Sequence, residues 1–207
     1  MQDSLGQTTQ TDETSSFSSV ILSEEPYLPA ETSEWYNFVQ GIPEHTKSLQ
    51  TEKYLSDAYE FARRRSEDPR TQVGATIVGS GGQSFGTNRM PGFLHLIPER
   101  LRSDTKADFL IHAERDAICS AAKHGIKTGG GKIFAPWACC AQCAHAIISA
   151  GLKELVVHTS IMLQTPERWQ QSVQLGLSLC MEAGVIVWRY TGLLNCTILF
   201  NGEEARF

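Results

Sequence analysis

Four residues in the middle of the chain have the types and spacing of a metal centre with a proton carrier. One residue separates His112 from Glu114, and two residues separate Cys140 from Cys143. An imidazole and two thiolates give Zn²⁺ three protein ligands, which leaves one tetrahedral position open for water, as in a catalytic rather than a structural site. The spacing therefore predicts a catalytic zinc site on His112, Cys140 and Cys143, with Glu114 as the acid–base residue.

Both residue pairs lie where the sequence predicts the beginning of a helix. One helix opens near Ile111 and is expected to end at Gly125 and the glycines 129–131. A second helix covers residues 140–150, and a strand over 132–137 places the two helices side by side. The free N–H groups and the positive dipole of a helix N-terminus stabilise a thiolate over a thiol. The predicted elements therefore gather the four residues and favour metal binding by the cysteines.

Three other interpretations of the cysteines compete with the catalytic one. The two residues could form a redox pair, belong to a closed structural zinc site, or simply be buried. The redox interpretation is disfavoured because the pair lacks the thioredoxin-like aromatic residue before it and leaves His112 and Glu114 unused. A closed site needs Cys139 or His145 as a fourth ligand, but His145 lies two residues past Cys143 and should point away from the metal. The catalytic interpretation leads, and the closed and buried alternatives stay open.

The rest of the chain alternates between strand and helix patterns. A helix begins near Leu49 and ends at Asp68-Pro69, before a hairpin with strands over 73–78 and 84–87. The later part places strands at 132–137, 154–158 and 184–190, with helices at 140–150 and 166–182. A hairpin followed by this alternation predicts an α/β fold, a three-layer α/β/α domain around one mixed five-stranded sheet.

The metal residues resemble the signature of the zinc-dependent cytidine and deoxycytidylate (dCMP) deaminase family, in which His-x-Glu precedes Cys-x-x-Cys. Residues 68–75, Asp-Pro-Arg-Thr-Gln-Val-Gly-Ala, resemble a strand of the deoxycytidylate deaminase branch. Residues 86–91, Gly-Thr-Asn-Arg-Met-Pro, resemble a loop of the same branch. The resemblance covers residues 50 to 190 or so and implies a cytidine deaminase-like fold.

The resemblance also implies a reaction, a cofactor and substrate contacts. Zn²⁺ would activate a water and Glu114 would move the protons in a hydrolytic deamination, with dCMP to dUMP as the leading reaction. Asn88 would bind the sugar, the Ala113 backbone would contact the base, and Trp137 would wall the pocket, with core packing as an equal alternative for Trp137. Two other functions stay open: deamination of another nucleobase, free or in RNA or single-stranded DNA, and a catalytically inactive, zinc-stabilised binding module. An intact Glu114 argues against the inactive module.

A nucleotide substrate needs a counter-charge for its phosphate. The loop from Asn88 to Lys106 carries five cationic candidates, namely Arg89, His95, Arg100, Arg102 and Lys106. Arg89 leads because it follows Asn88 directly, and a surface charge without a ligand is the alternative role for it.

The sequence departs from the family pattern at three positions near the site. Cys139 stands where Pro usually precedes the first cysteine, but the Cys-x-x-Cys spacing selects Cys140 as the ligand. Arg89 stands in place of a Gly, and Asp116 in place of an Asn. These changes bear on the exact substrate more than on the type of reaction.

Composition bounds the partners and the organisation of the protein. Residues 1–46 hold eight acidic side chains and no Lys or Arg, so residues 47–207 carry 18 basic against 15 acidic side chains. We expect an acidic, partly disordered extension over 1–46, whose aromatic part after residue 26 packs on the body or on a neighbouring subunit, and a deaminase domain over 47–207. The small basic surplus suits a small-molecule nucleotide and disfavours nucleic acid as a partner.

The mean hydropathy is -0.22, and the sequence has neither a secretory signal nor an apolar run long enough to cross a membrane. We therefore expect a cytoplasmic protein. We also expect a homo-oligomer.

Overall fold

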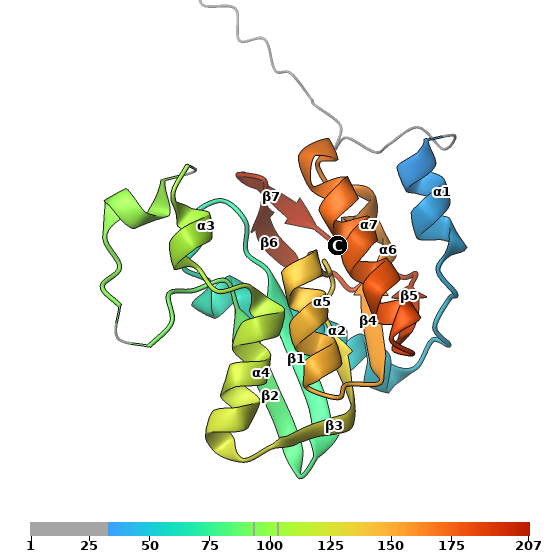
Figure 1. Cartoon of the computed structure of the whole chain (residues 1–207). Coiled ribbons are helices and arrows are strands. Elements are labelled where there is room, and N and C mark those ends of the chain that lie inside the picture. The colour runs from blue at the N-terminus through green and yellow to red at the C-terminus, as the bar shows by residue number, and fades with distance from the viewer. Residues whose placement is uncertain (1–32, 93, 103) are drawn as a thin grey trace, which may run out of the picture.

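A mixed five-stranded sheet forms the centre of the protein. The computed structural model describes residues 33–92, 94–102 and 104–207 and is shown in Figure 1. The strands follow the spatial order β2-β1-β3-β4-β5. They are β1 (Gly74–Ser80), β2 (Gly82–Thr87), β3 (Lys127–Phe134), β4 (Glu154–His158) and β5 (Ile186–Tyr190). β2, β1 and β3 pair antiparallel, whereas β3, β4 and β5 are parallel. The predicted α/β fold with a mixed five-stranded sheet is confirmed.

Helices cover both faces of this sheet, because its strands bury alternate residues in two different clusters. Ile133 and Leu155 belong to the cluster that holds the apolar residues of α4 (Ala113–His124), α5 (Ala141–Ser149) and α7 (Glu167–Glu182). Their strand neighbours Phe134 and Val156 pack instead with Leu55 of α2 (Leu49–Arg65). Figure 1 shows α4, α5 and α7 on one side of the sheet and α2 on the other. This three-layer arrangement follows from the period-two burial of the strands.

The helix that begins next to His112 lies directly on the first hairpin. A Cβ added at Gly86 of β2 would come within 2.2 Å of the Ala113 carbonyl oxygen and the Ala117 amide nitrogen. Ala113, Ala117 and Ala121 are all fully buried, so the small stripe allows this close packing, as the sequence predicts. The contact fixes the N-terminus of α4, and with it His112, against the sheet.

The expected elements differ most from the structure around the glycine segment 129–131. α4 ends at Gly125, whereas the glycines 129–131, which we expected to help end it, lie inside β3. β3 therefore begins at Lys127, five residues before the predicted strand. The register between β1 and β3 shifts between Val78 and Ser80, and this irregularity accommodates the glycine segment in the sheet.

The N-terminal part of the described chain joins the main core. Helix α1 (Glu34–Gly41) buries Trp35 and Val39, which pack in the same cluster as α5 and α7. The Trp35 indole donates a hydrogen bond to the Met162 carbonyl at 2.9 Å, next to the short helix α6 (Thr159–Leu163). Residues 34–42 thus pack on the folded body. The expected flexibility of the first two dozen residues lies outside the described residues.

Several short elements complete the fold. They are the 3₁₀-helix η1 (Pro98–Leu101) and helix α3 (Lys106–Phe109) between β2 and α4, and the C-terminal strands β6 (Thr197–Phe200) and β7 (Glu203–Arg206). β6 and β7 form an antiparallel hairpin that the sequence analysis did not identify. Within the described part of the chain, no helix combines the length and apolar character that a bilayer crossing requires.

His158, at the end of β4, should make the stability of the protein depend on pH. Its Nε2–H donates to the Gly192 carbonyl at 2.7 Å, so Nδ1 accepts from the Tyr59 hydroxyl at 2.8 Å in the neutral form. Burial lowers the pKa of His158 to about 4, whereas an unfolded histidine has a pKa near 6.5. The unfolded chain therefore takes up the proton first, and stability is lost as the pH falls from about 6.5 toward 4.

We expect this histidine to reduce the free energy of unfolding by about 2 kcal/mol between pH 7 and pH 5. Urea unfolding of the wild type and of His158→Gln at both pH values measures this loss, because glutamine does not titrate in this range. The variant should lose about 2 kcal/mol less than the wild type over the same interval. Equal losses in both proteins would contradict the assignment.

Candidate zinc centre and active site

The three predicted ligands converge at the N-termini of α4 and α5. His112 is the N-cap of α4, Cys140 is the N-cap of α5, and Cys143 lies in the first turn of α5. The Nδ1 atom of His112 is 3.5 Å from each of the two sulfur atoms, and the three ligand atoms all lie within 4.8 Å of one another. Tetrahedral zinc, with Zn–S near 2.3 Å and Zn–N near 2.0 Å, places its ligand atoms at similar separations.

The donor set fits a zinc ion with an open coordination position. In the part of the chain that the structure describes, no fourth His, Cys or carboxylate joins His112, Cys140 and Cys143. His145 is exposed on α5, and Cys139 is buried in the main core beside α7, so neither closes the site. Two sulfurs and one nitrogen suit Zn²⁺ better than an oxygen-preferring cation such as Mg²⁺ or Ca²⁺. The site therefore matches the open, three-ligand form.

Local hydrogen bonds prepare the cysteines to bind metal. A hydrogen bond from the Cys143 thiol, with a second from His112, lowers the pKa of Cys140 to about 3. The same hydrogen bond with Cys140 raises the pKa of Cys143. The hydrogen bond to Cys140 also raises the pKa of His112. Binding of the metal as two thiolates displaces the proton that the two cysteines hold between them.

Glu114 lies beside the ligands without being one of them. It belongs to the first turn of α4, and only 3% of its surface is exposed. Burial raises the pKa of its carboxyl group, which the positive charge of His112 partly offsets. A carboxyl group in such surroundings exchanges protons closer to neutral pH than an exposed one does. This placement would suit a proton carrier next to a bound metal ion.

A cavity of about 400 Å³ opens beside the candidate zinc centre. Its inner lining includes His112, Glu114 and Cys140, and Asn88 and Trp137 also line it. The volume lies in the lower part of the range for small-molecule sites. Ala113, by contrast, is fully buried beneath the cavity and is not one of its lining residues.

Asn88 and Trp137 are both held in place by hydrogen bonds. The Asn88 side-chain amide donates to the Thr71 carbonyl at 3.1 Å, which leaves its oxygen free to accept another bond. The Trp137 indole donates to Thr165 Oγ1 at 2.9 Å, and its ring packs edge-on against Phe200 at 5.1 Å. Trp137 is therefore part of the packing and also lines the cavity.

Arg89 lies elsewhere than the sequence analysis expected. It is not among the cavity-lining residues, and its guanidinium contacts the buried Asp116 carboxylate at 2.8 and 2.7 Å. The same carboxylate accepts a hydrogen bond from the Thr87 amide at 3.1 Å. The two positions that depart from the family pattern thus pair with each other. A phosphate-binding role for Arg89 loses its support, because this guanidinium already neutralises Asp116.

The other cations of the same loop are mostly engaged as well. Arg102 pairs with Asp104, and Arg100 donates to the His95 carbonyl. Only Lys106 of the five candidates lines the cavity.

Sequence reasoning gave no site role to five polar residues that line the cavity: Asp68, Arg70, Thr71, Arg168 and Asn201. Arg70 follows the Asp68-Pro69 helix stop, so its position after a turn was a signal. Asn201 belongs to an Asn-Gly pair, which is a strong hairpin signal. Arg168 and Trp169 fall where the deoxycytidylate deaminase branch has a similar stretch, and that resemblance was the signal for Arg168.

The fold and the site together define a zinc-binding α/β protein with a buried glutamate beside an open metal position. The chain matches the family described as "Cytidine and deoxycytidylate deaminase zinc-binding region" over residues 48–159. This match spans more than half of the chain, and the protein belongs to this deaminase family.

Individual relatives agree with this membership. The chain is 33% identical over 116 residues to human deoxycytidylate deaminase, which is 52% of this chain and 64% of that protein. It is 38% identical over 92 residues to ComE operon protein 2 of Bacillus subtilis (strain 168), which is 43% of this chain and 49% of that protein. The chain thus spans less than two thirds of the length of these relatives.

A solved structure is similar over its whole length. It is dCMP deaminase from the cyanophage S-TIM5 in complex with dCMP and dUMP, with 25% identity and a TM-score of 0.56. The similarity covers 70% of this chain and 99% of the phage chain.

Proposed function

We propose that this protein catalyses the hydrolytic deamination of dCMP to dUMP. The observation that carries the proposal is the placement of a buried carboxyl group, Glu114, beside an open His–Cys–Cys centre at the inner end of a nucleotide-sized cavity. The similarity to the phage enzyme, which was solved with dCMP and dUMP, supports the choice of substrate.

His112, Cys140 and Cys143 would hold the zinc ion. When bound, zinc lowers the pKa of a water molecule toward neutrality and so supplies the nucleophile for attack on C4 of the pyrimidine. Glu114 would accept one proton from that water and donate it to ring nitrogen N3. It would then take the remaining proton from the hydroxyl group added at C4 and pass it to the amino group, so that the C4–N bond breaks, ammonia leaves and the C4 carbonyl forms. A carboxyl group whose pKa is raised by burial suits both halves of this transfer, because it accepts a proton more readily than an exposed carboxylate and can still release it.

The cavity walls would orient the substrate. The free carboxamide oxygen of Asn88 is available to a sugar hydroxyl, and the Trp137 ring offers an apolar face to the base. Ala113 lies in the chain between His112 and Glu114 but does not line the cavity, so we include no contact of its backbone with the base in the proposal. The contacts of Asn88 and Trp137 would fix the position of C4 relative to Glu114. Holding reacting groups in a fixed geometry supplies much of the rate enhancement of a reaction between two partners.

Cations at the cavity favour a nucleotide over a nucleoside. Arg70, Lys106 and Arg168 all line it, and the two arginines are exposed, whereas the Glu114 carboxyl is buried. The cavity therefore has a deep end suited to the base and an outer, positively charged end suited to the phosphate.

We expect kcat/KM for dCMP to exceed that for deoxycytidine by about 100-fold, because two charge-assisted hydrogen bonds to the phosphate contribute roughly 3 kcal/mol. Ammonia release from dCMP, deoxycytidine, a cytidine-containing RNA and a single-stranded oligodeoxynucleotide measures the preference. Equal rates with nucleoside and nucleotide, or faster turnover of a polynucleotide, would contradict the proposed substrate. Absence of turnover with every substrate by the zinc-loaded protein would indicate the binding module instead.

A further inference from the structure

The C-terminal hairpin lies outside the residues that match the family, yet it reaches the active-site cavity. β6 and β7 cover residues 197–206, beyond the matched region that ends at residue 159. Asn201 and Gly202 form the two-residue turn, with φ values of 57° and 95°. Both positive angles fit a type I′ turn, the tight connection that Asn-Gly favours. Asn201, at the tip, lines the cavity that contains Glu114.

Buried contacts hold this hairpin firmly against the body of the protein. Phe200 packs on Trp137, and Phe207 stacks on Tyr59 at a centroid distance of 5.7 Å. Phe200 and Phe207 are 3% and 1% exposed. The Gln72 amide donates to the Leu199 carbonyl at 2.8 Å, and the Gln72 side-chain oxygen accepts from the Leu199 amide at 2.9 Å. The turn is therefore a fixed part of the cavity wall.

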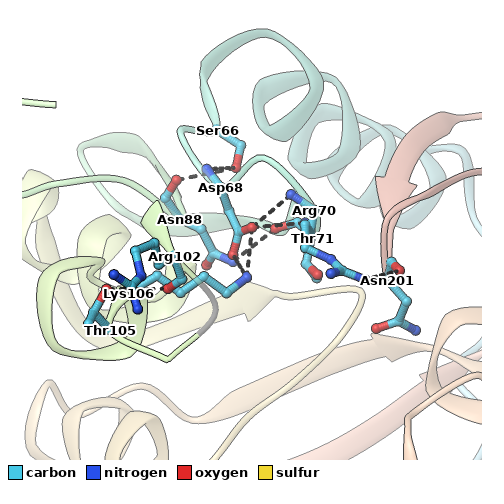
Figure 2. Close-up of polar contacts among 9 residues, drawn as sticks. All are labelled: Ser66, Asp68, Arg70, Thr71, Asn88, Arg102, Thr105, Lys106 and Asn201. Carbon is cyan, nitrogen blue, oxygen red and sulfur yellow. Dashed lines mark hydrogen bonds and ion pairs between the residues drawn. The ribbon is translucent and has the colours of Figure 1, made fainter. Parts of the chain in front are cut away.

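Arg70 is held between this turn and Asp68, as Figure 2 shows. Asp68 Oδ1 accepts from the Arg70 amide at 2.9 Å, and the Arg70 carbonyl accepts from the Gly202 amide at 2.7 Å. The Arg70 guanidinium donates to the Asn201 carbonyl at 3.5 Å. A Cβ at Gly202 would lie 3.2 Å from Arg70 Nη2, so the turn and the guanidinium are in close contact.

In the part of the chain that the structure describes, the charge of Arg70 is not neutralised by a neighbouring carboxylate. Lys106, which lines the same cavity, is bound by both Asp68 oxygens at 2.8 and 2.7 Å. Among the described residues, no carboxylate forms an ion pair with Arg70 or Arg168. Asp68 thus satisfies the lysine and positions the Arg70 backbone, while the guanidinium faces outward with donors to spare.

We propose that the β6–β7 hairpin and Arg70 together form a specificity element, in which the Asn201 turn positions the Arg70 guanidinium to bind the terminal phosphate monoester of the substrate. This inference rests on the proposed function and adds to it a structural source for the choice of a 5′-nucleotide. A planar guanidinium binds a phosphate through two parallel hydrogen bonds, and the turn restricts its orientation. Arg70 lies within the region that matches the family, residues 48–159, whereas the hairpin lies after it.

Asn201→Asp tests the proposal with a change of one charge. Aspartate tolerates the left-handed turn conformation, so the hairpin should fold, while its carboxylate would pair with Arg70 and repel a phosphate. We expect KM for dCMP to rise roughly 10-fold or more, whereas kcat/KM for deoxycytidine should stay within about 2-fold. Asn201→Gly keeps the turn without the charge and serves as the matched control, with a KM for dCMP near the wild-type value.

A double-variant cycle then shows whether Asn201→Asp acts through Arg70. Arg70→Ala should itself raise KM for dCMP roughly 10-fold, and Asn201→Asp should add less than about 2-fold in that background. Arg102→Ala, which removes an exposed guanidinium outside the cavity lining, should leave KM unchanged. Equal effects of Asn201→Asp on nucleotide and nucleoside, full additivity with Arg70→Ala, or no effect on KM would each overturn the proposal.

Binding of dUMP to the zinc-loaded protein separates this inference from the proposed function. Calorimetry should show dUMP binding that weakens roughly 10-fold in Arg70→Ala. Arg70-dependent binding of dUMP without any turnover of dCMP would overturn the proposed reaction but support the phosphate site. Turnover of dCMP, together with dUMP binding that does not depend on Arg70, would support the proposed reaction but overturn the phosphate site.

Discussion

Replacing Glu114 by Gln is expected to lower kcat by about 1,000-fold while leaving zinc content and fold unchanged. Glutamine has nearly the same shape as glutamate but carries no proton that it can give and take at neutral pH. Glu114 lies outside the ligand group, so the change removes no metal donor. It is buried against the cavity with a raised pKa, and a neutral amide in its place adds no buried charge.

Three measurements separate loss of proton transfer from loss of structure. Zinc content by metal analysis, thermal unfolding and dUMP binding should each match the wild type in Glu114→Gln. Glu182→Gln, an exposed residue in α7, is the matched control and should retain full activity. Activity of Glu114→Gln within a few-fold of the wild type would show that another group carries the proton.

The metal centre was predictable from the sequence because it depends on short-range spacing at helix starts. His112 and Cys140 are both N-caps in the structure, so each ligand pair is arranged mainly by its own helix. Only the pairing of β1 with β3 and the packing of α4 on the sheet are needed to bring the two helix starts together. The predicted order of strands and helices already implies that these two helices are neighbours on the sheet.

The role of Arg89 was not predictable in the same way. Its partner Asp116 lies 27 residues away on a different element, and neither residue signals the other through local spacing. The two positions had been identified as separate departures from a family pattern, yet the structure shows one ion pair. A buried carboxylate needs a compensating charge, and the Arg89 guanidinium supplies that charge to Asp116.

The cations that line the cavity illustrate a second limit of the sequence analysis. The loop from 88 to 106 is close to Asn88 in sequence, but Arg70 and Asn201, which are 131 residues apart, are the residues in contact at the cavity. The Asn-Gly pair at 201–202 predicts a hairpin turn. The strands on either side of it are only four residues long, so their alternation of polar and apolar residues gives a weak signal. Where that hairpin packs depends on Phe200 and Phe207, whose partners Trp137 and Tyr59 only the tertiary fold reveals.

Removal of both cysteine ligands is expected to abolish zinc binding and to destabilise the protein strongly. Wild-type protein should contain about one zinc per chain, and Cys140→Ala combined with Cys143→Ala should contain almost none, because a single imidazole binds zinc weakly. The ion links the starts of α4 and α5, so its binding free energy adds to the stability of the fold. We expect the melting temperature of the wild type to fall by at least about 10 °C when a chelator removes the metal, since 1 kcal/mol corresponds to about 2–4 °C at this size.

Two single variants make the choice of ligands specific. Cys139→Ala changes the thiol next to Cys140 and should keep the zinc, because Cys139 is buried beside α7 and does not belong to the ligand group. Cys119→Ala, at an exposed position of α4, is the control for loss of any cysteine. Zinc bound at full occupancy by the double variant, or lost from Cys139→Ala in a protein that still folds, would mean that the metal lies on a different set of thiols. The chelator experiment on wild-type protein tests the stabilising role even where the double variant does not fold, because no residue is changed.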